Sequence, residues 1–118
     1  MAAHNESGRA GEALARTYFQ QLGYTILHSN WRFGHLEVDV IAEHGGMLHF
    51  IEVKYRSGGQ YGPPESAVNR QKFNYLARAA AAFLEKHPQY RDLRFDILAI
   101  RQPAGAEPEY FLIEDVFL

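Results

Sequence analysis

Hydrophobic and polar positions alternate along this chain with two different periods. Two segments, residues 8–22 and 66–86, have the helical period, and Gly23 is a natural stop for the first of them. The stripes predicted to be buried are Gly11, Leu14, Tyr18 and Leu22 in the first segment and Phe73, Leu76, Ala80 and Leu84 in the second. Both segments are therefore expected to form amphipathic helices.

Five further segments are predicted to be extended. They are residues 24–28, 35–42, 47–53, 93–100 and 110–113. Within the second of these, one side carries Leu36, Val38 and Val40, and the other carries His35, Glu37 and Asp39. The third is apolar on both faces, as expected of a central strand that is covered on both sides. Gly45-Gly46 predicts a hairpin turn between these two strands.

The order of the predicted elements is helix, three strands, helix and two strands. This order predicts one α/β domain in which a mixed β-sheet is flanked by helices. The 118 residues fit a single domain over 1–118, with residues 1–7 as a flexible N-terminus. Residues 57–64 are rich in Gly and Pro and are expected to form a loop.

Composition excludes several kinds of chemistry. The chain has no cysteine, which rules out disulfide frameworks, thiolate zinc sites and cysteine nucleophiles. It has no Gly-x-Gly-x-x-Gly, Walker-type or Gly-x-Ser-x-Gly motif. No apolar run approaches the roughly 20 residues that span a bilayer, and the polar N-terminus lacks the core of a signal peptide. We therefore expect a cytoplasmic protein with no membrane partner.

Charge is distributed unevenly along the chain. The net charge is −2, but residues 54–91 hold seven Lys/Arg against two Glu, a balance of +5. The rest of the chain has a balance of −7. The positive segment is compatible with contacts to nucleic acid and equally with an ordinary solvated helix surface.

Charged residues in strand patterns need an explanation, and the notable ones are Asp39 in the second strand and Glu52 and Lys54, which close the most apolar strand. Folding the chain at Gly45-Gly46 places Asp39 opposite position 52, and Glu52 and Lys54 project from the same face of their strand. Two neighbouring carboxylates repel each other unless a positive charge lies between them. Magnesium or manganese, bound through oxygen, is one solution, and an interstrand ion cluster involving the lysine is the other.

A metal held by two carboxylates and a backbone carbonyl would activate water and polarise a phosphate. The Lys54 ammonium could orient the attacking water or offset the charge that builds on the phosphate. The set is thus typical of phosphodiester hydrolysis, although Glu-x-Lys alone is a common pattern.

The combined pattern resembles the PD-(D/E)XK nuclease superfamily, and more closely the YraN-like family of small bacterial proteins related to Holliday-junction resolvases. The matching stretches are Gly11-Glu12-Ala13, Gly23-Tyr24-Thr25-Ile26-Leu27, Asn30-Trp31-Arg32, Glu37-Val38-Asp39-Val40-Ile41-Ala42, Phe50-Ile51-Glu52-Val53-Lys54-Tyr55-Arg56 and Lys72. One departure is that glycine stands at Gly34 and Leu36 precedes Glu37, which suggests a locally shifted backbone.

The resemblance implies a restriction-endonuclease-like core and a role for each matched residue. Asp39 and Glu52 would bind Mg²⁺ or Mn²⁺, with the Val53 carbonyl as a third ligand. Lys54 would be the catalytic lysine, and Glu12 would join the site from the first helix, directly or through a water. Without the resemblance, Glu12 is an acid in a helix first turn, and Lys72, placed with the catalytic set, is a lysine that snorkels along its helix.

Other residues have weaker support. Arg32, Arg56 and Arg70 would contact phosphates or would be surface charges. Four histidines, His28, His35, His44 and His49, lack a metal-binding spacing. Trp31 and Tyr61 are expected to pack rather than to stack on bases.

Two functions follow from these observations. The first is a metal-dependent endonuclease acting on DNA, with branched or otherwise structured DNA implied by the resolvase resemblance. The second is a DNA-binding or protein-interaction module that keeps the nuclease fold without cleaving. A homodimer is a further expectation, because resolvases act as dimers on two-fold symmetric junctions.

Overall fold

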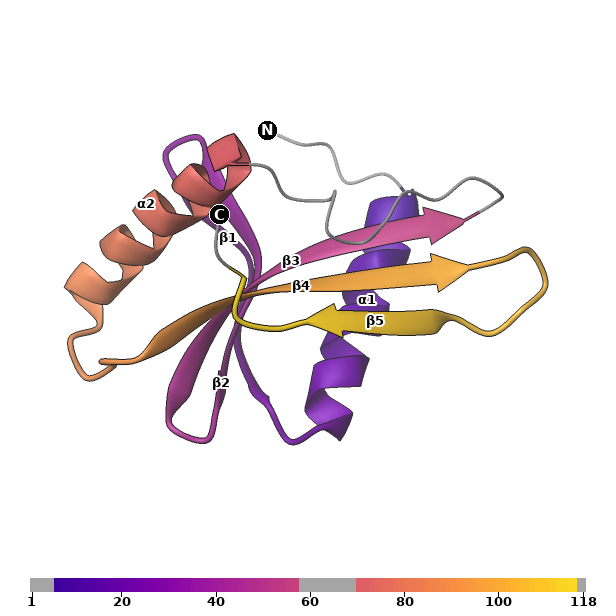
Figure 1. Ribbon diagram of the computed structural model, residues 1–118, viewed down its shortest axis with the longest axis horizontal. Helices are drawn as coiled ribbons and strands as arrows, with labels where there is room; N and C mark the ends of the chain where they lie inside the picture. The colour runs from indigo at the N-terminus through magenta and orange to yellow at the C-terminus, as the bar shows by residue number, and fades with distance from the viewer. Residues whose placement is uncertain (1–5, 58–69, 117–118) are drawn as a thin grey trace.

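The computed structural model describes residues 6–57 and 70–116. The elements are α1 (Glu6–Gln21), β1 (Thr25–Phe33), β2 (Leu36–His44), β3 (Met47–Ser57), α2 (Arg70–Lys86), β4 (Leu93–Gln102) and β5 (Glu109–Ile113). Their order is the predicted one (Figure 1). The fold class is confirmed as a single α/β domain with a mixed sheet and two helices, consistent with a restriction-endonuclease-like core.

The five strands form one sheet in the order β1-β2-β3-β4-β5, so the apolar strand β3 is central, as predicted. Strands β3 and β4 are parallel and are joined through α2, whereas the other neighbours are antiparallel. A parallel pair requires a crossover of this kind, while antiparallel neighbours can be joined by tight turns. The β2–β3 turn is Gly45-Gly46, where both residues have positive φ, as such a two-residue turn demands.

Each face of the sheet packs against one helix. Leu48 and Phe50 of β3 pack with Leu76, Ala79, Ala80 and Phe83 of α2. On the other face, Ile51 of β3 and Leu98 of β4 pack with Ala15 and Phe19 of α1. Figure 1 shows the two helices on either side of the sheet. The alternation of β3 residues between the two clusters fixes which helix each of its side chains faces.

The stripe predicted for the first helix is partly wrong. Gly11 is buried and Leu14 and Tyr18 are half-buried, but Leu22 is 49% exposed. The cause is the helix end: Gly23 has φ 92°, and the Tyr24 amide donates to the Phe19 carbonyl. This closing motif stops α1 at Gln21 and turns Leu22 outward.

The β1–β2 hairpin also differs from the prediction. Strand β1 extends to Phe33, five residues past the predicted end, although Ser29-Asn30 reads as a turn. Asn30 adopts φ 54° within the strand, a conformation that asparagine tolerates better than most residues. Gly34, with φ 62°, lies in the hairpin turn, so its position reflects the turn and no bulge beside Glu37.

The predicted single side for Leu36, Val38 and Val40 is wrong. Leu36 and Val38 pack with the α2 cluster, whereas Val40 packs with the α1 cluster. The change falls at Asp39, which the β1–β2 register places opposite the left-handed Asn30. For the second helix, the predicted start at residues 66–69 lies outside the described residues.

Candidate active site

The sheet forks at the position of Asp39 and Glu52. Within the described strands, pairing of β2 with β3 ends at Val40 opposite Ile51, and the next step along this register sets Asp39 level with Glu52. The predicted register is therefore confirmed. Beyond the fork, Glu52 to Ser57 pair with β4. Beyond Val40 the backbones of β2 and β3 no longer pair, and side chains occupy the space between the two strands.

Asp39 closes the base of this fork. Its Oδ2 accepts a hydrogen bond of 2.8 Å from the Val53 amide, which takes the place of the missing strand partner. A strand residue directs its N–H and C=O to the same side, so the Val53 carbonyl also points toward β2. The fork thus brings two carboxylates and one backbone carbonyl into reach of each other.

Glu52 is flanked by two lysines. It is 4% exposed, and its Oε2 lies 3.1 Å from the Nζ of Lys72 and 3.7 Å from the Nζ of Lys54. Lys54 shares the α2-facing side of β3 with Glu52, and Lys72 reaches over from the first turn of α2. The structure therefore brings Asp39, Glu52, Lys54 and Lys72 together, four of the residues predicted from the sequence.

Within this cluster, the negative charge of Asp39 is less well compensated than that of Glu52. Burial and then the repulsion of Glu52 raise the pKa of Asp39 to about 7, against the opposing effects of the Val53 amide and Lys72. Burial alone would lower the pKa of Lys72, but the attraction of Glu52 outweighs it and the pKa is raised. Lys72 stays an ammonium, and Asp39 is under-compensated.

Glu12 reaches the same region from α1. Its Oε1 accepts a 3.0 Å hydrogen bond from Nδ2 of Asn30, the residue level with Asp39 on β1. The preceding Gly11 permits this approach, since a Cβ there would lie 2.7 Å from Cβ of Tyr55 on β3. Glu12 is thus held beside the fork through Asn30.

Asn30 is a site residue that the sequence analysis left without a role. Its Oδ1 is buried and has no hydrogen-bond donor among the described residues, a situation that proteins commonly satisfy with bound water. An asparagine inside a strand segment, where this residue type is uncommon, was the available signal.

The donor set fits a hard divalent cation. Magnesium is often held by one or two carboxylates and keeps several waters, so Asp39, Glu52 and the Val53 carbonyl suffice as protein ligands. In the part of the chain that the structure describes, no three His, Asp or Glu side chains converge as a metal cage. A cation between Asp39 and Glu52 would also remove the repulsion that raises the pKa of Asp39.

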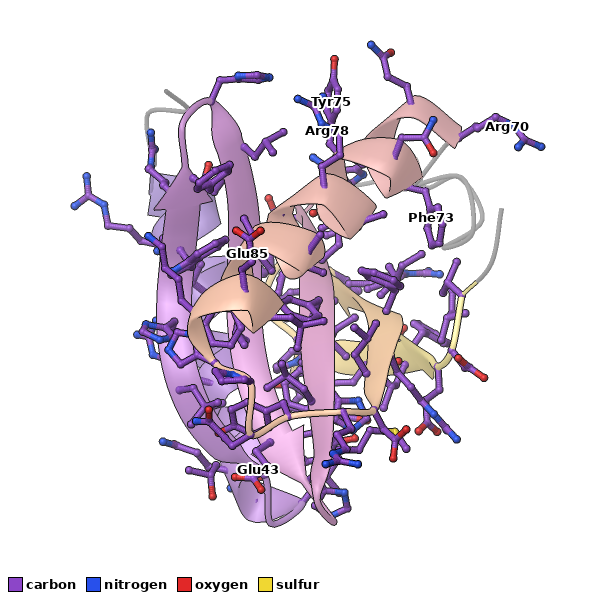
Figure 2. All side chains as sticks on the ribbon, turned by 90° about the vertical axis from the view of Figure 1, so that its left-hand side faces the viewer. Glu43, Arg70, Phe73, Tyr75, Arg78 and Glu85 are labelled. Atoms are coloured by element: carbon purple, nitrogen blue, oxygen red, sulfur yellow. The ribbon has the colours of Figure 1, made fainter. Side chains whose placement is uncertain are left out.

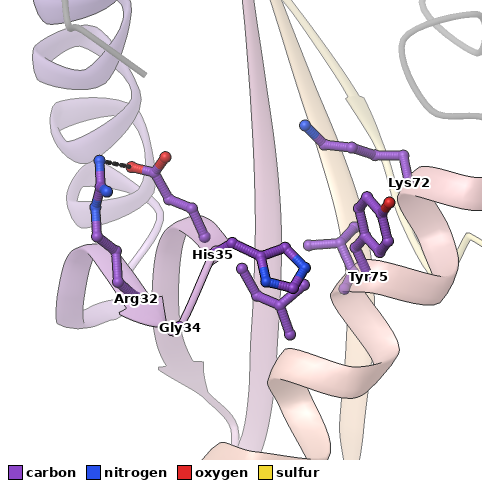
Figure 3. A pocket seen from close by; sticks show the side chains of 8 residues that line it. Arg32, Gly34, His35, Lys72 and Tyr75 are labelled. Atoms are coloured by element: carbon purple, nitrogen blue, oxygen red, sulfur yellow. Dashed lines mark ion pairs between the residues drawn. The ribbon is translucent and has the colours of Figure 1, made fainter. Parts of the chain in front are cut away.

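The three arginines predicted to touch phosphates lie apart from one another. Arg32 is near the site, where it forms a 3.8 Å ion pair with Glu37 directly across the β1–β2 hairpin (Figure 3). Arg70 projects into solvent at the start of α2 (Figure 2). Arg56 is exposed near the end of β3. Their contact with phosphate stays a prediction.

Two other residues considered in the sequence analysis, His49 and Trp31, make contacts within the folded protein. His49 is buried, with Nδ1 2.6 Å from Oδ2 of Asp96, a buried acid that the sequence analysis did not single out. Trp31 packs against Phe83, as predicted, with ring centroids 5.4 Å apart. Tyr61 lies outside the described residues.

The fold is consistent with a restriction-endonuclease-like core, the core of the PD-(D/E)XK superfamily. Within it, the chain belongs to the family described as "Uncharacterised protein family UPF0102", the YraN family, whose model matches residues 11–100.

Relatives in several bacteria support this membership. A UPF0102 protein of Chlorobium chlorochromatii is 44% identical over 113 residues, covering 94% of this chain and 88% of the relative. One of Bacteroides thetaiotaomicron is 42% identical over 100 residues, covering 85% and 83%. UPF0102 protein FP2501 of Flavobacterium psychrophilum is 37% identical over 118 residues, covering 99% and 98%. Separately, neither described helix is long and apolar enough to cross a membrane.

Proposed function

We propose that this protein is a metal-dependent endonuclease that hydrolyses phosphodiester bonds in structured DNA. The observation that carries the proposal is Asp39, a partly buried carboxylate set against Glu52 at the fork of the sheet, with Lys54 beside them. The Val53 amide and Lys72 do not fully offset the burial of Asp39 and its repulsion from Glu52, so the pKa of Asp39 stays raised. Perturbed carboxylates of this kind gather at functional sites.

Each residue has a role in this reaction. Asp39, Glu52 and the Val53 carbonyl would hold Mg²⁺ or Mn²⁺, which when bound lowers the pKa of a coordinated water and polarises the phosphate. Lys54 would orient the attacking water and stabilise negative charge on the phosphate oxygens. The water oxygen bonds to phosphorus and gives up one proton to solvent, the bond from phosphorus to one deoxyribose oxygen breaks, and that oxygen takes up a proton from solvent.

Glu12 and Lys72 act at the edges of this set. Glu12, held by Asn30, would bind a water at the fork, because its other oxygen is oriented by the same contact. Lys72, 3.1 Å from Glu52, would turn to the phosphate once a divalent ion neutralises that carboxylate. Lys54 and Lys72 both place positive charge where the phosphate backbone of the DNA must approach.

One observation favours a second candidate, a DNA-binding or interaction module that does not cleave. Lys54 and Lys72 already neutralise Glu52 without a metal ion. If these ion pairs persist in the presence of Mg²⁺, the cluster of Glu52, Lys54 and Lys72 only stabilises the fold. DNA would then be held by the exposed Lys and Arg side chains of the positively charged part of the chain, without being cleaved.

The test is cleavage of four-way junction, flap, single-stranded and linear duplex DNA in Mg²⁺, Mn²⁺ or EDTA. Lys54→Ala and Asp39→Asn should each lower the rate by at least about 100-fold, the loss typical of a removed catalytic group. Lys86→Ala, an exposed lysine in the last turn of α2, is the matched control and should cleave normally. Cleavage that survives in Asp39→Asn would contradict the proposal, and DNA binding without turnover would favour the second candidate.

A further inference from the structure

A cavity of about 490 Å³ lies between the tip of the β1–β2 hairpin and the first turns of α2 (Figure 3). We call it the hairpin cavity. It is lined on the hairpin side by Arg32, His35 and Glu37 and on the helix side by Lys72 and Tyr75. Its volume is in the range of sites that bind small organic groups, roughly 300–1,000 Å³.

The walls of the hairpin cavity combine three kinds of chemistry. The rings of His35 and Tyr75 stand at 90° to each other with centroids 6.0 Å apart, and Tyr75 is 37% exposed. Leu36 and Leu76, both buried, supply apolar surface. Arg32 contributes a donor and Glu37 an acceptor, and the two are paired at 3.8 Å. Flat apolar faces with polar edges are the features of a nucleobase, which such walls suit.

Lys72 connects the hairpin cavity to the fork. Its side chain lines the cavity, and its Nζ lies 3.1 Å from Oε2 of Glu52. A phosphate at the fork and a base in the cavity would therefore be close neighbours on one strand, with Lys72 between them. The stacked interior of a duplex does not offer a base in this way, so the nucleotide must be unpaired or turned out of its stack.

We propose that the hairpin cavity receives one unpaired nucleobase of the DNA strand whose phosphate lies at the Asp39–Glu52 fork. The inference rests on the proposed function for the identity of the polymer as DNA. It deepens that function, because a strand with an unpaired nucleotide, as in a flap, a junction or single-stranded DNA, becomes the substrate class.

The experiment measures binding without cleavage, in EDTA and again in Ca²⁺. The probe is a labelled single strand of about 12 nucleotides, within the span of small nucleic-acid-binding domains, beside the same strand with abasic residues. Removing the bases should weaken binding to the wild type by about five- to tenfold, the effect of one lost stacking contact. A blunt duplex should bind more weakly than the intact strand.

The variants assign this effect to the cavity. Tyr75→Ala should weaken binding of the intact strand about five- to tenfold and leave the abasic strand unchanged. Tyr75→Phe keeps the ring and should bind normally, and His35→Ala removes the hairpin ring that packs edge-on against Tyr75 and should also weaken binding of the intact strand. Phe111→Ala removes an aromatic side chain of similar exposure, 46%, from β5 and should have no effect.

Three outcomes would overturn the inference: no strand binding in either buffer, equal losses for intact and abasic strands in Tyr75→Ala, or no loss for either. A free mononucleotide that displaces the strand at equal nucleotide concentration would reassign the cavity to free nucleotides and also overturn it. None of these depends on turnover. If the wild type cleaves DNA and Tyr75→Ala binds the strand as tightly as the wild type, the proposed nuclease function stands and the cavity inference fails. If binding depends on the bases and on Tyr75 but no DNA is cleaved, the cavity inference stands and the proposed nuclease function fails.

Discussion

Asp39 and Asp96 are two acids held within the same sheet, on β2 and β4, in opposite electrostatic surroundings. Asp96 is 1% exposed and fully engaged: Oδ2 lies 2.6 Å from His49 Nδ1, and Oδ1 accepts a 2.9 Å hydrogen bond from the Asp115 amide. Asp39 is less buried, yet it faces a second carboxylate, and its pKa is raised to about 7. Among the described residues, the Val53 amide and Lys72 oppose that shift.

The difference separates a structural acid from a functional one. Asp96, on β4, connects this strand to β3 and to the C-terminal segment. One of its oxygens contacts His49 of β3, and the other accepts from the Asp115 amide. Asp39 leaves part of its charge uncompensated at the point where the β2–β3 ladder ends. Burial of an acid is therefore uninformative by itself, and the partners of its two oxygens decide what it does.

The largest expected effect comes from exchanging each acid for its amide. Asp96→Asn should lower the free energy of unfolding by about 3 kcal/mol, since an amide has one acceptor oxygen and cannot replace both oxygens that Asp96 directs to His49 and the Asp115 amide. Asp39→Asn should lower it little or not at all in EDTA at pH 8, because it removes a repulsion. Urea denaturation of both variants measures the contrast. Equal losses would show that Asp39 is as structural as Asp96.

The pH dependence of stability should carry the signature of Asp39. Its folded-state pKa of about 7 exceeds the ordinary 3.8, so its contribution is fully present below pH 3.8 and is lost as pH rises to about 7. With allowance for its partial exposure, the loss should be roughly 2–4 kcal/mol. The measurement is the wild-type curve in EDTA minus that of Asp39→Asn, which cancels other groups. A flat difference between pH 4 and 8 would contradict the raised pKa.

Divalent ions should reverse this loss. At a concentration of about 100 times Kd, Mg²⁺ or Mn²⁺ should raise the free energy of unfolding by about 2.7 kcal/mol through binding to the folded state. Asp39→Asn and Glu52→Gln should lose the gain. Asp96→Asn, although less stable, should keep it and serves as the matched control. A metal gain that survives in Asp39→Asn would place the ion elsewhere.

The smallest effect concerns the link between Asn30 and Glu12. Asn30→Ala should lower stability by about 1–2 kcal/mol, because alanine tolerates φ 54° poorly and the Glu12 hydrogen bond is lost. Asn30→Gly accepts the backbone and should cost less. If Asn30 positions Glu12 for cleavage, both variants should slow cleavage equally. A slower rate in Asn30→Ala alone would assign the effect to the backbone.

The sequence predicted the fold from local signals. Gly45-Gly46, a doubly apolar β3 and two helical periods gave the element order, the central strand and the register that aligns Asp39 with Glu52. The length of β1 was underestimated, because asparagine at position 30 reads as a turn signal when its partner strand is unknown. Leu22 was wrongly predicted to be buried, because α1 ends at Gln21, one residue before the end of the predicted apolar stripe.

The sequence by itself determined which residues could form the site, since charged residues inside apolar strands are expensive to bury and therefore conspicuous. The turn at Gly45-Gly46 singled out Asp39 through its register with Glu52, but no local pattern showed that Asp96 has a buried partner. Only the tertiary structure paired Asp96 with His49, 47 positions away, and brought Lys72 and Glu12 from opposite helices to the fork. The physical reason is that compensation of a buried charge depends on distances between atoms of different elements, which packing alone sets.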